Sequence, residues 1–152
     1  MHKINNGRMI LAGIVAAVIL DILEYVSNGV LLASAWADSL KHIGVAPLSV
    51  RGIIAFNVWS VVVGFLAIWL YVAIRPRFGP GPKTALLAAA VVWTLGWPLS
   101  MVAPLAMHVV PRSLAINSVL LGIPEMAIAV LIGAAVYKEE SAQAPRVASA
   151  VA

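Results

Sequence analysis

Four long apolar runs constrain the fold of this chain more than any other feature. They cover about 9–33, 53–74, 84–107 and 114–136. Because a helix rises about 1.5 Å per residue, each run can cross the roughly 30 Å of a bilayer's hydrocarbon. None alternates as a membrane strand does, and a helix satisfies its own backbone polar groups in lipid. The runs predict an all-α integral membrane bundle of four helices, up-down-up-down.

The composition explains why lipid is the expected partner of this surface. The chain is 62% hydrophobic and 11% charged, whereas a soluble domain carries about 25% charged residues. We therefore expect a multi-pass protein of a cell membrane, such as a bacterial inner membrane. The net charge of +4 comes from Lys and Arg that flank the apolar runs and never form a dense cluster, so nucleic acid is not an expected partner.

The links between the runs are short, and they predict one transmembrane domain over 1–140 with a flexible tail over 141–152. The link 36–52 is amphipathic and is expected to be a loop. The link 75–83 reads RPRFGPGPK, in which prolines and glycines end one helix and begin the next. A tight turn is expected at 108–113.

The orientation in the membrane follows from counting basic residues. Seven of the ten Lys and Arg residues lie at the N-terminus, in the second link and in the C-terminal segment, and three lie in the first and third links. Basic residues gather on the cytoplasmic side of membrane proteins. We therefore expect both termini to be cytoplasmic.

A cleaved signal peptide is the rival interpretation of the first run. It has a basic start, an apolar middle and the small residues Ala33 and Ala35 at a signal-peptidase spacing. Asp21 and Glu24 interrupt its apolar part, which argues against cleavage. We expect the first run to remain as a membrane helix.

Carboxylates at mid-membrane depth are the main functional clue. Asp21, Glu24 and Asn28 are spaced by three and four residues, which places them on one helical face. Glu125 lies near the middle of the fourth run. No Lys, Arg or His lies in the middle of any run. Acids at such depth usually face the bundle interior or a water-filled cavity. Because neighbouring acids share protons, we expect at least one to be neutral at pH 7.

Prolines modify the helices around these acids. Pro124 leaves the carbonyl of Leu120 without its helical donor, and an oxygen beside a carboxylate suits a proton or a cation. Pro98 and Pro104 predict a kink in the outer half of the third helix.

Other polar and aromatic residues are candidates for a cavity wall. Trp93 and Trp97 share a face, because they are four residues apart, and they are candidates for an aromatic wall. Further polar residues fall in the outer halves of the helices, where they would form a vestibule above the acids if they face one another: Asn57, Ser60, Ser100 and Asn117. The alternative is structural, with these side chains and tryptophans acting in helix packing and the acids pairing with Asn28 or Thr94.

Three functional hypotheses follow. The first is a small transporter of a proton, a cation or a cationic amphipathic solute, in which Asp21, Glu24 and Glu125 bind the cargo and Asn28 positions them. The second is a non-catalytic scaffold or accessory subunit, whose acids pair with a basic residue of a partner membrane subunit. The third is an enzyme, which we do not expect because no nucleophile, metal-binding or phosphate-binding motif is present.

Cofactors and metals have little support in the sequence. The absence of cysteine excludes thiolate zinc sites, iron–sulfur clusters and disulfides. His42 and His108 fall near the outer links without the ligand spacing of a zinc site, so no metal or cofactor is expected. Small residues four apart, such as Gly13 and Ala17, predict close helix contact within the bundle or in a homo-oligomer.

Overall fold

The structure, a computed structural model, describes residues 4–137 of the chain. The tail predicted over 141–152 lies outside this range. The elements are α1 (Asn6–Glu24), the π-helix η1 (Tyr25–Leu31), α2 (Ala33–His42), α3 (Val50–Phe78), α4 (Pro82–Gly96), α5 (Pro98–Ala106) and α6 (Arg112–Val136).

The four predicted membrane spans are confirmed. Asn6–Leu31, Val50–Phe78, Pro82–Ala106 and Arg112–Val136 are each long and apolar enough to cross a bilayer. At most 39% of the most apolar window of any span is buried inside the molecule. The remaining apolar surface has to be covered by something other than water, which identifies a multi-pass membrane protein.

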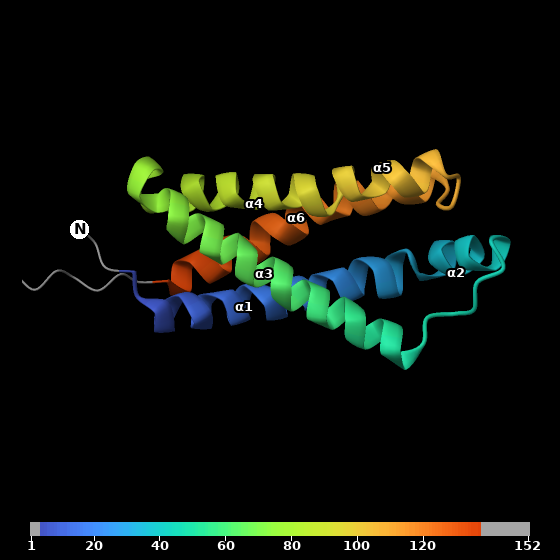
Figure 1. Cartoon of the computed structure of the whole chain (residues 1–152), viewed down its shortest axis with the longest axis horizontal. Helices are drawn as coiled ribbons and strands as arrows, with labels where there is room; N and C mark the ends of the chain where they lie inside the picture. Colours follow the sequence, from blue (N-terminus) through green and yellow to red (C-terminus); the bar gives the residue numbers. More distant parts are fainter. Residues whose placement is uncertain (1–3, 138–152) are drawn as a thin grey trace, which may run out of the picture.

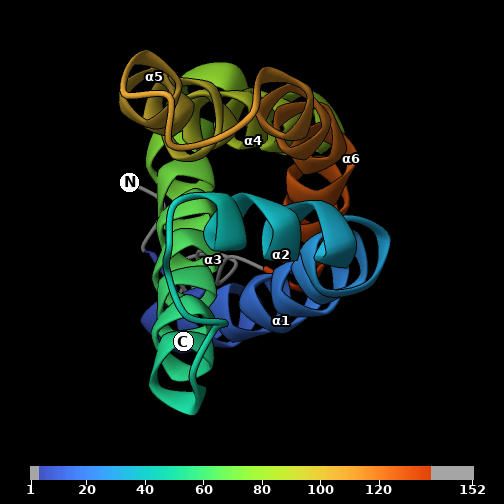
Figure 2. The same ribbon diagram turned by 90° about the vertical axis from the view of Figure 1, so that its right-hand side faces the viewer.

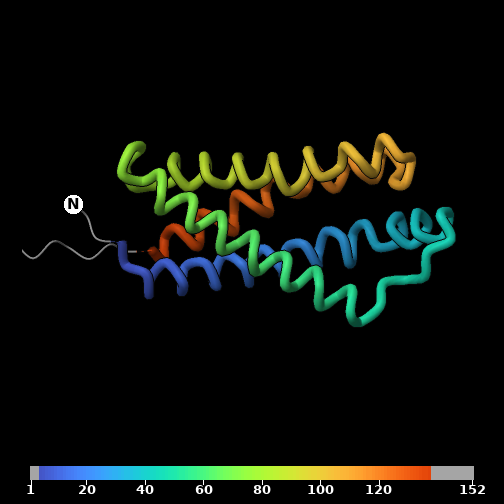
Figure 3. Tube along the Cα trace, viewed as in Figure 1, coloured from blue at the N-terminus to red at the C-terminus, as the bar shows by residue number. Residues whose placement is uncertain are grey.

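The spans form a closed ring of antiparallel helices (Figure 1). α1 packs against α3 and α6, and α4 packs against the same two helices. α3 runs diagonally across the bundle to reach α4 (Figure 3). The described chain begins and ends at the same end of the bundle, which confirms the up-down-up-down order.

This order separates the basic residues as the sequence predicts. Arg8, Arg75, Arg77 and Lys83 lie at the end where α1 begins. Lys41, Arg51 and Arg112 fall at the opposite end, which we call the outer end. That the first end faces the cytoplasm stays a prediction.

Small residues hold α1 close to its neighbours. A Cβ added at Gly64 of α3 would lie 2.6 Å from the backbone Cα and N of Ala17 in α1. One added at Gly133 of α6 would lie 2.9 Å from the carbonyl oxygen of Ala12 and from the Cβ of Ala16. Such close backbone contact increases dispersion attraction where lipid removes any hydrophobic drive for association. These small residues are therefore used within the bundle.

The structure of the first link differs from the sequence-based expectation of a loop. The predicted loop 36–52 contains most of α2, which is a helix. Its composition of Ala, Ser, Leu and Trp is compatible with a helix, and Lys41 and His42 lie in the last turn, where positive charge favours the negative end of the dipole. Gly44, with φ of 70°, reverses the chain after it. The amphipathic pattern was therefore that of a short surface helix.

The predicted kink in the third span is confirmed. α4 ends at Gly96 and α5 begins at Pro98. Pro98 has no N–H to continue the ladder, and its ring crowds the preceding turn. Trp97, between the two helices, is 5% exposed, so the break turns its indole into the bundle.

Gly64→Ala tests whether the α1–α3 contact limits stability. The added methyl has no room against the backbone of Ala17, so we expect the free energy of unfolding in detergent to fall by about 1–3 kcal/mol. The matched control is Gly96→Ala, whose Cβ would lie 3.8 Å from the nearest atom, in the Trp59 ring. Equal stability of Gly64→Ala and the parent chain would contradict the close packing described here.

Candidate functional site

Glu125 is the most unusual side chain in the bundle. It lies near the middle of α6, is only 4% exposed, and neither Oε1 nor Oε2 makes a hydrogen bond of strict geometry. The buried face of α6 otherwise carries mainly small or apolar side chains, including Ala129 and Val130. A carboxylate in such surroundings costs several kcal/mol unless it gains a proton or a positive partner.

Glu24 lies beside Glu125. It is the last residue of α1 and is half-buried. The two carboxyl groups interact electrostatically, and Glu24 interacts more strongly with Glu125 than with Asp21. Ser27, one turn further along, also faces Glu125 and is 6% exposed. Ser27 and Glu24 approach Glu125 closely without meeting strict hydrogen-bond geometry. Glu24 and Glu125, which share one depth in the membrane, therefore lie next to each other, and Asp21 interacts more weakly with Glu24.

A hydrogen-bond chain connects this pair to the outer end. The indole Nε1–H of Trp36 donates to Asn28 Oδ1 at 3.0 Å. The Asn28 amide Nδ2–H donates to Glu24 Oε2 at 2.7 Å. Asn28 therefore pairs with Glu24, as the structural alternative expected for one of its two candidate partners, whereas the hydroxyl of Thr94, the other candidate, donates to the carbonyl of Ala90 in its own helix.

The π-helix η1 carries Asn28 and Ser27. Its wider turns lead into Leu32, which has φ of −103° and ψ of 5° and ends the first span. In a π-helix each amide donates to the carbonyl five residues earlier, and this pattern continues to the end of the segment, where the amide of Leu32 donates to the carbonyl oxygen of Ser27 at 2.8 Å. Short π-helical segments cost stability and occur frequently at functional sites. Here the segment aligns Asn28 and Ser27 with the two acids.

Helix α2 lies across the outer end of the bundle above the acids. Figure 2 looks onto this end and shows α2 crossing the space between α1, α3 and α6. Two hydrogen bonds hold it there. One is the bond from Trp36 to Asn28, and the other runs from Ser39 Oγ to the carbonyl of Val109, at 3.3 Å. α2 therefore covers the outer approach to the acid pair.

Trp93 and Trp97 both lie against α6. Trp93 Nε1–H donates to the carbonyl of Val119 at 3.1 Å, beside the carbonyl expected to be free. The indole of Trp97 occupies the space over Gly122, where any Cβ would collide with it. Its ring also makes an edge contact with Trp59, with centroids 5.3 Å apart. Because Gly122 precedes Glu125 by one turn, Trp97 fills the bundle just outward of the acid.

Within residues 4–137, no hydrogen bond joins the four residues of the predicted polar vestibule to the acids, and the vestibule stays a prediction. Asn57, Ser100 and Asn117 are exposed, and the first two bond to carbonyls of their own helices. Ser60 is buried. Side chains that form local hydrogen bonds need not face the acids, so depth alone does not place them.

Ser27 and Trp36 were missed by the sequence analysis. Ser27 follows Glu24 by three residues, a spacing that already placed it on the same face. Trp36 begins the link 36–52 that was expected to be a loop, and only the folding of α2 over the bundle brings it to Asn28.

The site offers oxygen atoms that could accept a proton or a cation. Between residues 4 and 137 there is no group of three or more His, Asp or Glu side chains that could hold a metal ion. The cluster instead offers four carboxylate oxygens from Glu24 and Glu125 and the hydroxyl of Ser27. Oxygen donors of this kind suit a proton, a hydrated small cation or an ammonium group.

Comparisons of the chain with protein-family models, with curated proteins and with solved structures find no match.

Glu125→Met tests whether the buried acid is kept at a cost to stability. A carboxyl without a positive partner is replaced by an apolar side chain of similar volume, so we expect the free energy of unfolding to rise by about 1 kcal/mol or more. Asp38→Met, at an exposed position of α2, is the control and should bring no such gain. A marked loss of stability in Glu125→Met would show that the acid is a structural element.

Trp36→Phe tests the connection between α2 and the acids. A smaller aromatic ring replaces the indole and the donor to Asn28 is lost, so we expect local opening of α2 to become easier by about 1 kcal/mol. Hydrogen exchange at the amides of 33–42 should be roughly fivefold faster. Trp69→Phe, at a position 51% exposed on α3, should leave exchange in α2 unchanged. Unchanged exchange in Trp36→Phe would mean that this bond does not hold α2.

Proposed function

We propose that this protein is a small membrane transporter of a proton, a cation or a cationic amphipathic solute, with Glu24 and Glu125 as its binding groups. The observation that carries the proposal is the buried carboxyl of Glu125, which has no basic residue of the described chain, 4–137, beside it and faces a second acid, Glu24, and the hydroxyl of Ser27. Ionisable groups inside membrane bundles most often belong to ion pathways or proton relays.

The carboxyl pair would work through competition. In the empty state a proton is shared between Glu24 and Glu125, because two negative charges cannot be held together in an apolar interior. A cation that reaches the site supplies the positive charge and displaces that proton. Binding is then tighter at higher pH, where less free energy is needed to remove the proton. Asn28 would orient Glu24 through its amide donor, while Ser27 offers an oxygen to the cargo.

Access to the pair would be controlled from the outer end. Trp97 occupies the interior over Gly122, and α2 covers the space between the helices. Both would have to move for a solute to enter from that side. The bond from Trp36 to Asn28 links α2 to Glu24. A change in the charge of Glu24 would therefore alter the hydrogen bonds that hold α2 in place.

Burial of Glu125 favours this proposal over the scaffold hypothesis. A basic residue of a partner subunit would need to reach the acid, but helices of the same chain already cover it. A scaffold would more readily present its acids on a lipid-facing surface. We further propose that the protein forms a homo-oligomer in a bacterial inner membrane, with the basic end of the bundle in the cytoplasm. This arrangement is compatible with the transporter and with the scaffold hypothesis.

The first experiment measures proton release. Purified protein in weakly buffered detergent is mixed with sodium chloride or with tetraphenylphosphonium, an apolar cation. We expect tetraphenylphosphonium or sodium to release protons from the parent chain, and Glu125→Gln to abolish the release, because Gln has no exchangeable acid proton. Glu24→Gln, which retains an acceptor for Asn28, should reduce it.

Asp38→Asn is the matched control, since this acid is exposed on α2 and should not contribute. Release that persists in Glu125→Gln would contradict the assignment of the site. The absence of release with either cation, in folded protein, would count against the transporter and favour a search for partner subunits.

A further inference from the structure

A second buried polar group lies on the same interior face of α6 as Glu125. Ser118, Gly122 and Glu125 are spaced by four and three residues, so they share one face of the helix, and all three are buried. Ser118 is 6% exposed, and its Oγ has no hydrogen-bond partner within residues 4–137. Because a helix rises about 1.5 Å per residue, Ser118 lies about 10 Å outward of Glu125.

The hydroxyl of Ser118 differs from others in the apolar spans. Thr94 and Ser100 donate to carbonyls four residues earlier in the chain, which satisfies their hydroxyl groups locally. Ser118 makes no such bond to the carbonyl of Leu114. A buried hydroxyl without a partner lowers stability, and ordered water molecules bind to such groups in folded proteins. Ser118 therefore presents a water-binding group on the outer side of the acid.

The indole of Trp97 lies between these two polar groups. A Cβ added at Gly122 would collide with Nε1 and the neighbouring atoms of this ring, so the ring occupies the space that glycine leaves open. The edge contact with Trp59 supports the ring in this position. With the indole seated on Gly122, the interior face of α6 is closed between Ser118 and Glu125.

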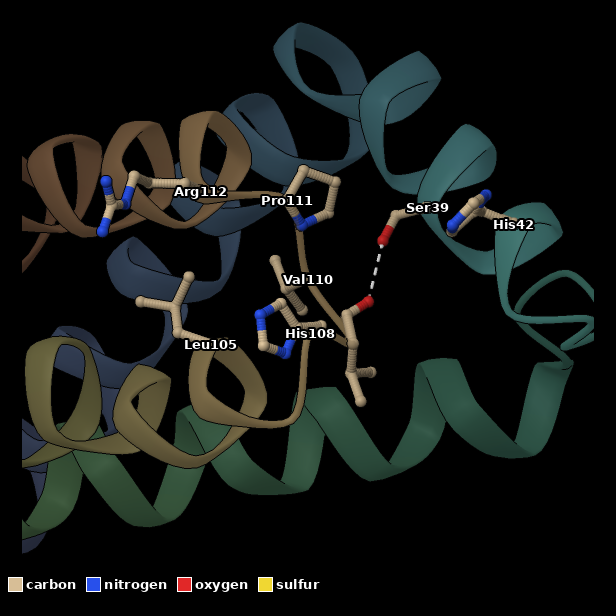
Figure 4. A pocket seen from close by; sticks show the side chains of 8 residues that line it. Ser39, His42, Leu105, His108, Val110, Pro111 and Arg112 are labelled. Atoms are coloured by element: carbon tan, nitrogen blue, oxygen red, sulfur yellow. Dashed lines mark hydrogen bonds between the residues drawn. The ribbon is translucent and has the colours of Figure 1, made fainter.

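The position of Trp97 in the chain allows the ring to move. Trp97 lies at the junction of α4 and α5, where a change in the angle between the helices redirects its side chain. α5 has no buried residue. Near its end, Leu105 borders a pocket of about 540 Å³ between α2 and the α5–α6 link, and Figure 4 shows the bond from Ser39 that ties α2 to this link. Few contacts therefore oppose movement of α5 about the junction.

We propose that water reaches Glu125 from the outer end along this face of α6, through a gate formed by Trp97 on Gly122, with Ser118 as the polar group outside the gate. The inference rests on the proposed function of the acid pair and names the residues that control access to it. The seated indole isolates the acids. The displaced indole admits water, and a proton or small cation enters with it. The Ser118 hydroxyl offers this water both a donor and an acceptor.

Modification of Glu125 by a water-soluble carbodiimide, which attacks neutral carboxyl groups from the aqueous phase, measures access to the acid. The full chain is placed in phosphatidylcholine nanodiscs, and mass spectrometry of its peptides follows Glu125, with the exposed Asp38 as internal standard. Gly122→Ala puts a methyl where the indole lies, and Trp97→Leu removes the indole without a clash. We expect each variant to speed modification of Glu125 about tenfold relative to Asp38, because the seated state is lost.

Gly133→Ala is the matched control for the gate. A Cβ at this glycine would also meet close atoms of α1 and α3, but it lies about two turns inward of Glu125. This variant should change the rate of Glu125 modification by less than about twofold. An acceleration equal to that of Gly122→Ala would mean general loosening of the bundle and would overturn the gate.

A chemical block tests the route itself, since the chain has no cysteine. The thiol of Ser118→Cys is treated with N-ethylmaleimide before the carbodiimide is added, and the adduct should slow modification of Glu125 about tenfold by filling the route. Asn117→Cys, at the exposed neighbouring position, should react without changing that rate. A folded Ser118→Cys variant that does not react, or whose adduct leaves the rate unchanged, would overturn the route.

These readouts do not depend on transport, so failure of the route and failure of the proposed function are distinguishable. Gate-dependent modification of Glu125 without cation-driven proton release would keep the route and reject the transporter. Proton release that Glu125→Gln abolishes, together with a modification rate that neither gate variant changes, would overturn the route and keep the transporter.

Discussion

Close contact between α1 and its two neighbours is the feature on which the rest of the structure depends. Lipid offers no hydrophobic drive for helices to associate, so they must gain their attraction from packing. Alanine and glycine at Ala12, Ala16, Gly64 and Gly133 allow this packing at backbone distance. The same contact fixes the separation of α1 from α6. Glu24 can meet Glu125 only because nothing larger keeps these two helices apart.

Burial of the acid pair lowers the stability of the bundle, and the close packing of the helices compensates for that loss. A buried carboxyl without a positive partner and a π-helical segment both reduce stability, whereas the packed small residues increase it. Folded proteins retain such local costs mainly where function requires them. The hydrogen-bond chain through Asn28 fixes only one of the two acids. Glu125 makes no hydrogen bond of strict geometry and is held only by its contacts with Glu24 and Ser27.

Helix α2 is tied to two other parts of the molecule. Trp36 on one face bonds to Asn28 and so to the acid pair. Ser39, further along, donates to the carbonyl of Val109 in the link from α5 to α6. The main helix packing of α2 is against η1. A change in the charge of Glu24 would therefore reach α2 through Asn28 and Trp36 on the π-helical side, while the α5–α6 link holds its other face.

The sequence by itself determined the four spans, their antiparallel order, the break before Pro98 and the shared face of Glu24 and Asn28. These depend on run length and helical spacing, which are local properties of the chain. Whether a polar side chain faces inward is not a local property. Glu125 is buried and Asn57 is exposed, although both lie within apolar runs. The fold of α2 was likewise hidden, because an amphipathic segment becomes a covering helix only when a bundle end is present. Tertiary structure decided these points, since the meeting of Glu24 with Glu125 and of Trp36 with Asn28 requires segments to be packed before either contact exists.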